Sequence, residues 1–207
     1  AQMGADGIGE GSSSGIQMVL HFIMHFICAI CGCIQSPPIV LRRARYLRPS
    51  HHDPSMAHGL LKGKRGIITG ALNDQSIAWK VAELAHAEGA QIVLTNAPVA
   101  MRMGEINKLA EAIQAPIIPA DATNDADLEK LFTGSMEHFG GKADFVLHSI
   151  GMSPNVRKGR TYDDLNYEWY KQTLDISAMS FHRMLQAASK TDAINDWGSV
   201  VALSYIA

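Results

Sequence analysis

The sequence predicts an α/β fold in which a doubly wound parallel sheet occupies residues 56–207. Short apolar runs alternate there with segments in which apolar residues recur at helical spacing. Several of the runs end at a glycine or a small polar residue, as buried parallel strands do. Strands that alternate with helices favour a parallel sheet with right-handed crossovers, and this part of the chain is long enough to bury a core.

The first half of this region reads as strand, helix and strand. The run 66–68 predicts a short buried strand that ends at Gly70. Apolar residues within 77–85 recur at helical spacing, and Ser76 is placed to cap that helix. The run 92–94 predicts the second strand.

The second half continues the alternation as far as the last residues. Thr123 or Asn124 can cap a helix that points Leu128, Leu131 and Phe132 inward. The expected strands cover 116–118, 145–147 and 199–203, and the expected helical segments lie around 106–113, 128–132 and 169–190.

Composition changes near residue 56, and we expect residues 1–55 to be a non-globular extension. The run 16–34 contains no Asp, Glu, Lys or Arg, and its length just reaches that of a membrane span. Met56 lies just before the first predicted strand, where the natural protein is expected to start. We therefore interpret residues 1–55 as upstream sequence translated in frame, non-native or disordered, and not as a membrane anchor.

Charge and cysteine content narrow the class of protein. The formal net charge is −2, so the chain has no basic excess and we expect no nucleic-acid partner. The three cysteines all lie within 28–33, so the body has no disulfide framework and a reducing compartment, the cytoplasm, fits best. The spacing of these cysteines with His21 and His25 matches no zinc pattern, and we expect no metal site.

Four pairs of residues fall at the carboxyl ends of the predicted strands, where doubly wound sheets bind their ligands. They are Thr69-Gly70, Asp121-Ala122, Ile150-Gly151 and Ser204-Tyr205. A glycine turn between a buried strand and a helix leaves backbone N–H groups free for a phosphate, so the first pair indicates a Rossmann-like dinucleotide site. Gly70 is equally compatible with a tight turn that needs a positive φ.

The other pairs are compatible with the same ligand. The Asp121 carboxylate can accept a hydrogen bond from an adenine amino group, while Ala122 leaves room for the ring. Asp121 can instead be an ordinary loop or capping aspartate. Ile150 and Gly151 would let a ribose lie close to the backbone, or they form a simple turn.

Several motifs together resemble the enoyl-acyl carrier protein reductases, a divergent branch of the short-chain dehydrogenase/reductase family. They are Gly63-Lys64-Arg65, Thr69-Gly70 with Ser76-Ile77-Ala78, His148-Ser149-Ile150-Gly151, Asp175-Ile176-Ser177 and Leu203-Ser204-Tyr205. Ordinary short-chain dehydrogenases have T-G-x-x-x-G-x-G and N-N-A-G at two of these places.

The resemblance implies an NADH- or NADPH-dependent reduction of a trans-2-enoyl thioester carried by acyl carrier protein, in a homotetramer. Tyr205 matches the first of the family's two active-site tyrosines, and Ser153 lies where the family contacts the acyl substrate. The implied dinucleotide-binding residues are Gly70, Ser76, Ile77, Asp121, Ala122 and Ile150.

The chain departs from the family in two respects. No Asp or Glu follows the second strand to bind a ribose 2′-hydroxyl, so NADH and NADPH are not separated, and Arg102 can reach a 2′-phosphate. The sequence given stops before the lysine of the family's Tyr-x6-Lys motif, so we expect a sheet that is incomplete at its carboxyl-terminal end and a 207-residue chain without reductase activity. Two alternatives stay open: a carbonyl-reducing short-chain dehydrogenase and a non-catalytic nucleotide-binding module.

Overall fold

A computed structural model describes residues 57–102 and 105–204. The expected extension 1–55, with its apolar run 16–34 and its cysteines, lies outside these residues, and so does Tyr205. The elements in chain order are β1 (Arg65–Thr69), α2 (Ile77–Ala87), β2 (Gln91–Thr95), α3 (Pro98–Met101), α4 (Ile106–Ile113), α5 (Asp125–Phe139), β3 (Ala143–His148), α6 (Pro154–Arg157), the 3₁₀ turn η2 (Tyr162–Asp164), α7 (Tyr167–Leu174), the π-helix η3 (Asp175–Met179), α8 (Ser180–Lys190) and β4 (Ile194–Ala202).

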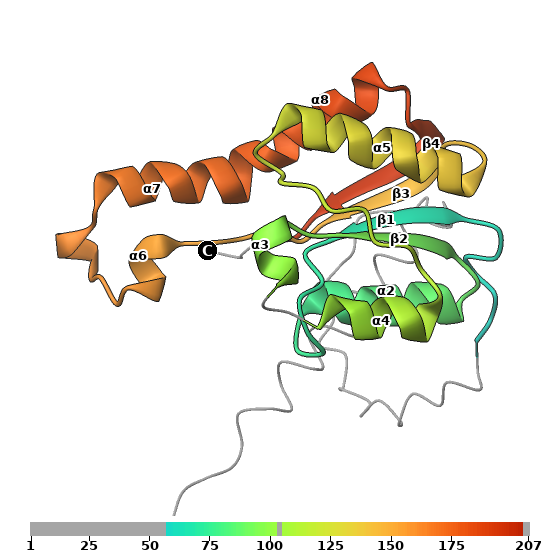
Figure 1. Ribbon diagram of the computed structural model, residues 1–207, viewed down its shortest axis with the longest axis horizontal. Coiled ribbons are helices and arrows are strands. Elements are labelled where there is room, and N and C mark those ends of the chain that lie inside the picture. The colour runs from blue at the N-terminus through green and yellow to red at the C-terminus, as the bar shows by residue number, and fades with distance from the viewer. Residues whose placement is uncertain (1–56, 103–104, 205–207) are drawn as a thin grey trace, which may run out of the picture. The chain divides into compact units, whose positions relative to one another are not determined.

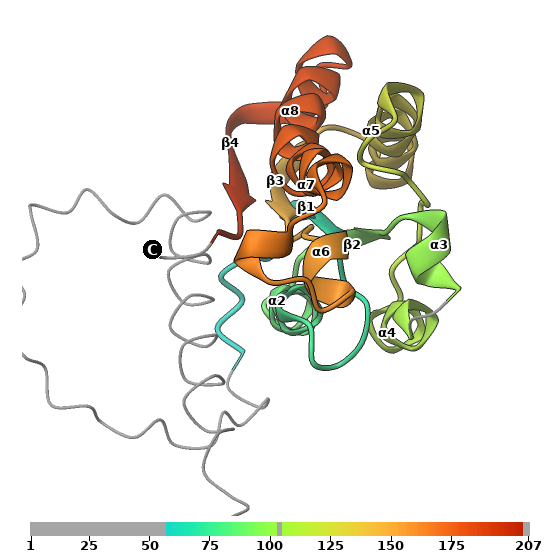
Figure 2. The ribbon, with the colours of Figure 1, turned by 90° about the vertical axis from the view of Figure 1, so that its left-hand side faces the viewer.

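The four strands form one parallel sheet in the order β2-β1-β3-β4. Helices α5 and α8 cover one face, and α2 and α4 cover the other (Figure 1), which confirms the predicted doubly wound arrangement. The end-on view of Figure 2 shows the same two layers on either side of the strands. Helices α3, α6 and α7 lie at the edge where the strands end (Figure 1).

One predicted strand is wrong. Residues 116–118 make a single parallel bridge, Leu94 to Ile117, instead of a strand. The Leu94 N–H donates to the Pro116 carbonyl, and the Ile118 N–H donates to the Leu94 carbonyl. Pro116 has no N–H to extend the ladder toward the start of β2. Past Ile118, the Ala120 N–H donates to the Asn96 carbonyl at 3.2 Å, but no second bridge forms among the described residues. The segment nevertheless lies beside β2, where the prediction placed it.

Strands β1, β2 and β3 are buried on both faces because they are apolar almost throughout, whereas the edge strand β4 is half-exposed along most of its length. Ile67, Val93 and Val146 pack against one cluster of buried helix residues, which are Leu128, Leu131, Phe132, Phe139, Met184, Ala187 and Ala188. The expected inward positions of α5 are thereby confirmed. On β1, Gly66 lies under the Phe145 ring, where a Cβ atom would stand 2.0 Å from the ring carbon Cζ.

The helical region expected around 169–190 is present and runs from Tyr167 to Lys190. It contains a π-helical turn, Asp175–Met179, that the sequence pattern did not predict. Such turns often accompany functional sites. Among the described residues, no helix is long and apolar enough to cross a membrane.

Asn124 is the N-cap of α5. The sequence offers Thr123 or Asn124 for this position. Its side-chain oxygen accepts hydrogen bonds from the N–H groups of Ala126, at 3.0 Å, and Asp127, at 3.2 Å. Asp125 and Asp127 in the first turn add favourable charge at the positive end of the helix dipole. The capping side chain thus fixes where α5 begins, directly after the Asp121–Thr123 loop.

We predict that Asn124→Ala lowers the free energy of unfolding by about 1 kcal/mol, because two N–H groups lose their acceptor. Asn124→Ser keeps a capping oxygen and should cost less. Urea denaturation of the three proteins measures the difference. An alanine variant as stable as the parent would contradict the capping role.

Candidate dinucleotide site

The ends of β1 and β3 meet at Gly70 and Ser149. Gly70 has a φ of +82°, and a Cβ atom there would lie 1.9 Å from the Ser149 carbonyl oxygen. The Thr69 hydroxyl donates to the Leu147 carbonyl at 3.0 Å and accepts from the Ser149 N–H at 3.1 Å. The two turns that the sequence singles out are therefore in direct contact. Position 70 requires a glycine for two reasons: its backbone is left-handed, and the Ser149 carbonyl leaves no room for a Cβ atom.

The Gly70 N–H is not free to hold a phosphate. It donates to the Thr95 carbonyl at 3.1 Å, which joins the turn to the end of β2. The Asn96 side chain adds a second link, since its Nδ2 donates to the Ala71 carbonyl at 3.1 Å. Gly70 thus shapes the site, and the N–H donors for an anion must come from farther along the turn.

Ser76 occupies the N-cap position of α2, but its hydroxyl does not cap the helix. The hydroxyl donates to the Asn73 carbonyl at 2.6 Å and accepts from the Leu72 N–H at 3.2 Å. The predicted helix cap is therefore wrong, because the preceding turn takes both bonds. The first N–H groups of α2, beginning at the exposed Ile77, have no acceptor within the helix and remain the natural donors to an anion.

Asp121 lies in a loop that is held from two sides. Its Oδ1 accepts from the N–H and the hydroxyl of Thr123, at 2.9 and 2.8 Å. On the other side, Arg183 of α8 donates to the Thr123 carbonyl at 2.7 Å and to Asp175 at 2.9 Å. One carboxylate oxygen of Asp121 thus stabilises its own loop, as a loop aspartate commonly does. The contact of Asp121 with an adenine stays a prediction.

The second turn is anchored to the π-helix through two hydroxyls. The Ser177 hydroxyl accepts from the Met152 N–H at 3.0 Å, and it donates to the Met152 carbonyl at 3.3 Å. The Ser180 hydroxyl donates to the Ile176 carbonyl at 2.6 Å and lies 2.8 Å from His148 Nε2. Since the Ser180 proton is already used, Nε2 of His148 carries the hydrogen and donates to Ser180.

His148 is buried at the end of β3, and its carbonyl accepts from the Leu203 N–H at 2.9 Å. Burial lowers the pKa of its imidazole, because the charged form is poorly solvated there. Its ring also meets Phe181 edge to face. The neutral ring therefore ties β3 to α8, and the His148 carbonyl ties β3 to the end of β4 that leads to Ser204.

Ser153 is the N-cap of α6. Its hydroxyl accepts from the Val156 N–H at 3.5 Å and lies 3.4 Å from the Thr173 hydroxyl. These are long contacts at a half-exposed position. The predicted substrate contact of Ser153 and the predicted catalytic role of Tyr205, which lies outside the described residues, both stay predictions.

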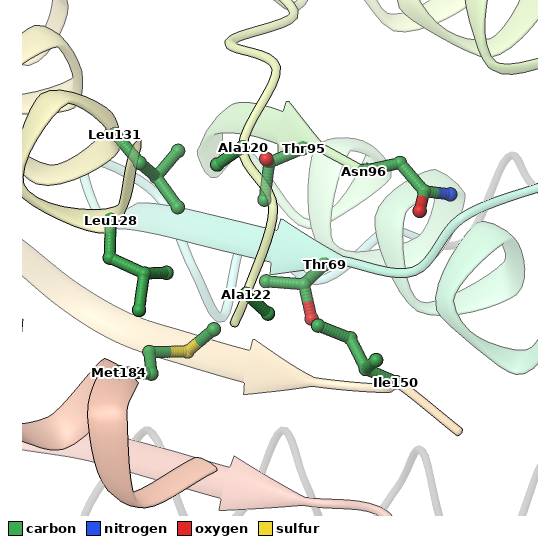
Figure 3. Close-up of a pocket in the computed structure, with 9 residues that line it drawn as sticks. All are labelled: Thr69, Thr95, Asn96, Ala120, Ala122, Leu128, Leu131, Ile150 and Met184. Atoms are coloured by element: carbon green, nitrogen blue, oxygen red, sulfur yellow. The ribbon is translucent and has the colours of Figure 1, made fainter. Parts of the chain in front are cut away.

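A small cavity of about 10 Å³ opens at the carboxyl edge of the sheet (Figure 3). It brings together Ala122 and Ile150, two of the predicted dinucleotide residues. Its lining is Thr69, Thr95, Asn96, Ala120, Ala122, Leu128, Leu131, Ile150 and Met184. Thr95 and Asn96 were missed by the sequence analysis, although a polar pair directly after the apolar run 92–94 was a usable signal.

The fold and the crevice at its strand ends define the class of protein: an α/β protein with a Rossmann-like fold. A family model described as enoyl-(acyl carrier protein) reductase matches residues 70–207. The chain belongs to the enoyl-acyl carrier protein reductase family, as its motifs had indicated.

Two curated relatives carry the name enoyl-[acyl-carrier-protein] reductase [NADH]. The FabI protein of Rickettsia bellii is 38% identical over 152 residues, which are 72% of this chain and 56% of that protein. Reductase 1 of Rhizobium meliloti is 34% identical over 152 residues, covering 73% of this chain and 54% of that protein. The chain thus spans little more than half the length of these relatives.

Solved structures give the same grouping. The FabI–NADH complex from Alistipes finegoldii is 68% identical, with a TM-score of 0.70 over 72% of this chain and 52% of that one. The enoyl-acyl carrier protein reductase from Anaplasma phagocytophilum, solved in complex with NAD, is 28% identical, with a TM-score of 0.62 over 70% and 55% of the two chains. Within the described residues of the present chain, no three His, Cys, Asp or Glu side chains converge to hold a metal.

We predict that Gly70→Ala destabilises the chain by more than about 1–2 kcal/mol, the cost of a left-handed backbone alone, because the new Cβ also meets the Ser149 carbonyl. Gly151→Ala is the matched control. Gly151 has no positive φ, and its added Cβ would have open space, so the change should stay within about 0.5 kcal/mol. Equal effects of the two substitutions in urea denaturation would refute the close contact.

We predict that His148 makes the stability of the chain depend on pH. Its pKa is lowered in the folded state, so below about pH 6.5 the unfolded chain binds more protons than the folded chain. The free energy of unfolding therefore decreases as the pH is lowered. The slope from one group reaches at most about 1.4 kcal/mol per pH unit. His148→Gln should reduce this slope, while His182→Gln, on the exposed side of α8, controls for loss of a histidine. Urea denaturation at several pH values measures the slope of the free energy of unfolding against pH. An unchanged slope in His148→Gln would count against the buried neutral ring.

Proposed function

We propose that the protein to which this chain belongs reduces trans-2-enoyl thioesters on acyl carrier protein with NADH, in fatty-acid elongation. The observation that carries the proposal is the contact of Gly70 with Ser149, which joins the two family motifs at one edge of the sheet. The relatives named above are NADH-type enoyl reductases, and the Alistipes relative was solved with NADH.

The residues present fit a dinucleotide. Helix α2 has eleven residues and presents its first N–H groups at the turn after β1, where a pyrophosphate would be held. Ala122 and Ile150 line a small apolar hollow, and a ring of the cofactor would lie against its mouth. Thr95 adds a buried hydroxyl without an internal partner among the described residues. A wall of small and apolar groups with few polar atoms is typical of cofactor sites.

The cofactor, when bound, would supply the hydride that reduces the β-carbon of the enoyl thioester, and the α-carbon gains a proton. This chain's own contribution is position and polarity at the thioester oxygen, where negative charge develops. The Tyr205 hydroxyl, three residues after Ala202 at the end of β4, would donate to that oxygen and stabilise the transition state electrostatically. Ser153 would lie beside the acyl chain.

The substrate side carries basic residues that suit an acidic carrier protein. Arg157 and Lys158 are exposed at the end of α6, next to Ser153. Arg160 is paired with Asp164 and lies over the Trp169 ring, so it is less available. Such charges act mainly on the association rate. We further propose a homotetramer in the cytoplasm, and Arg102, exposed after α3, as the residue that would meet a 2′-phosphate if NADPH binds.

We predict that the 207-residue chain binds NADH, and that Ile77→Pro weakens this binding. Proline at the first helical position fits the helix but removes an N–H donor, so the fold should be kept while an anion loses one bond, a change of about three- to tenfold. Calorimetric titration measures both dissociation constants. Ile77→Ala, which keeps the N–H, is the matched control and should bind like the parent.

The reaction is tested with a longer chain that contains the family's Tyr-x6-Lys motif. Consumption of NADH on addition of crotonyl-acyl carrier protein, and not of the 3-ketoacyl thioester, is expected. Activity only on the ketoacyl thioester would favour a carbonyl-reducing dehydrogenase. Binding of NADH without any turnover by the longer chain would favour a non-catalytic module.

A further inference from the structure

Two threonines occupy equivalent places at the ends of neighbouring strands, and only one has its hydroxyl satisfied. Thr69 on β1 and Thr95 on β2 face each other in the parallel register. The Thr69 hydroxyl has an acceptor, the Leu147 carbonyl, on β3 and a donor, the Ser149 N–H, just after β3. The Thr95 hydroxyl is buried without a hydrogen-bond partner. Among the described residues, no other buried side-chain nitrogen or oxygen lacks one.

An unpaired buried hydroxyl makes the folded chain less stable than a shape-matched apolar residue would. Thr95 is only 2% exposed, so bulk water does not compensate. Apart from Thr69 and Asn96, the residues that line the cavity with Thr95 are apolar, so a valine would fit there as well. A hydroxyl that costs folding stability needs a partner that is absent from the chain itself.

The Thr95 side chain lies in the cavity that the candidate dinucleotide residues share. Figure 3 shows it beside Ala120, with Ala122 and Ile150 on the far side of the hollow and the Asn96 side chain turned away. The cavity, at about 10 Å³, has room for one water molecule at most. A ligand at the cavity mouth would therefore lie within reach of the hydroxyl, directly or through that single water.

Strand order decides which half of a dinucleotide lies there. The sheet runs β2-β1-β3-β4, and the proposed catalytic Tyr205 follows β4 at one edge. Thr95 ends β2, three strand spacings away, which is about 14 Å at the usual separation of neighbouring strands. The reacting half belongs near β4, so the half that passes over β2 is the adenosine half.

We propose that the Thr95 hydroxyl is a hydrogen-bonding group for the adenosine half of the bound dinucleotide, and that it is kept for binding at the expense of folding stability. This inference rests on the proposed function. It adds a polar determinant on β2 to the residues of the β1, Asp121 and Ile150 turns.

The test compares Thr95→Val with Thr95→Ser and Thr69→Val. Thr95→Val should unfold at the same or a higher temperature than the parent, since no internal bond is lost. Its dissociation constant for NADH should rise about three- to tenfold, the value of one hydrogen bond. Thr95→Ser should keep the affinity. Thr69→Val, which removes two internal bonds, should lower the unfolding temperature.

Half-ligands locate the contact. The rise caused by Thr95→Val should be the same for ADP-ribose as for NADH, and absent for reduced nicotinamide mononucleotide. A Thr95→Val protein that unfolds at a lower temperature would show an internal partner and overturn the proposal. Unchanged affinity for ADP-ribose would overturn it while leaving the proposed function intact, whereas a parent chain that binds neither NADH nor ADP-ribose would overturn both.

Discussion

The close approach of Gly70 to Ser149 is the constraint on which the site depends. No side chain fits between the turn after β1 and the carbonyl of Ser149. Without that approach, the Thr69 hydroxyl could not bridge the Leu147 carbonyl and the Ser149 N–H. The same turn carries the start of α2 and, through the Gly70 N–H, the end of β2. Three of the four strand ends are thereby fixed relative to one another.

The prediction of the fold succeeded where the pattern is governed by burial. The runs at 66–68, 92–94 and 145–147 are apolar because helices cover them on both sides, and these runs lie in strands. The run 116–118 is apolar too, but hydrophobicity does not report the missing N–H of Pro116. These three residues are half-buried, and the predicted strand is a single bridge.

The site was predictable in its location and less so in its bonds. Sequence order placed Gly70, Asp121 and Ile150 at one edge because all strands are parallel. It could not show that the Ser76 hydroxyl turns back to Asn73, or that Oδ1 of Asp121 is held by Thr123. Hydrogen bonds of this kind depend on loop conformations that no periodicity encodes. Thr95 was missed for a related reason, since a threonine at a strand end normally finds a partner in the chain.

The two sides of the site are held with different strength, and this difference fits a division of labour. Around the proposed dinucleotide crevice, the side-chain bonds of Thr69 and His148 are buried or part-buried and measure 2.8–3.1 Å. On the substrate side, the contacts of Ser153 measure 3.4–3.5 Å and are partly exposed. Segments held by few and exposed bonds open at low free-energy cost. In the proposed function, the closely bonded turns would hold the cofactor in one place, while the Ser153 hydroxyl would adjust to the acyl chain. Helix α6 itself is held by two 3.0 Å bonds between Asn155 and Asn166.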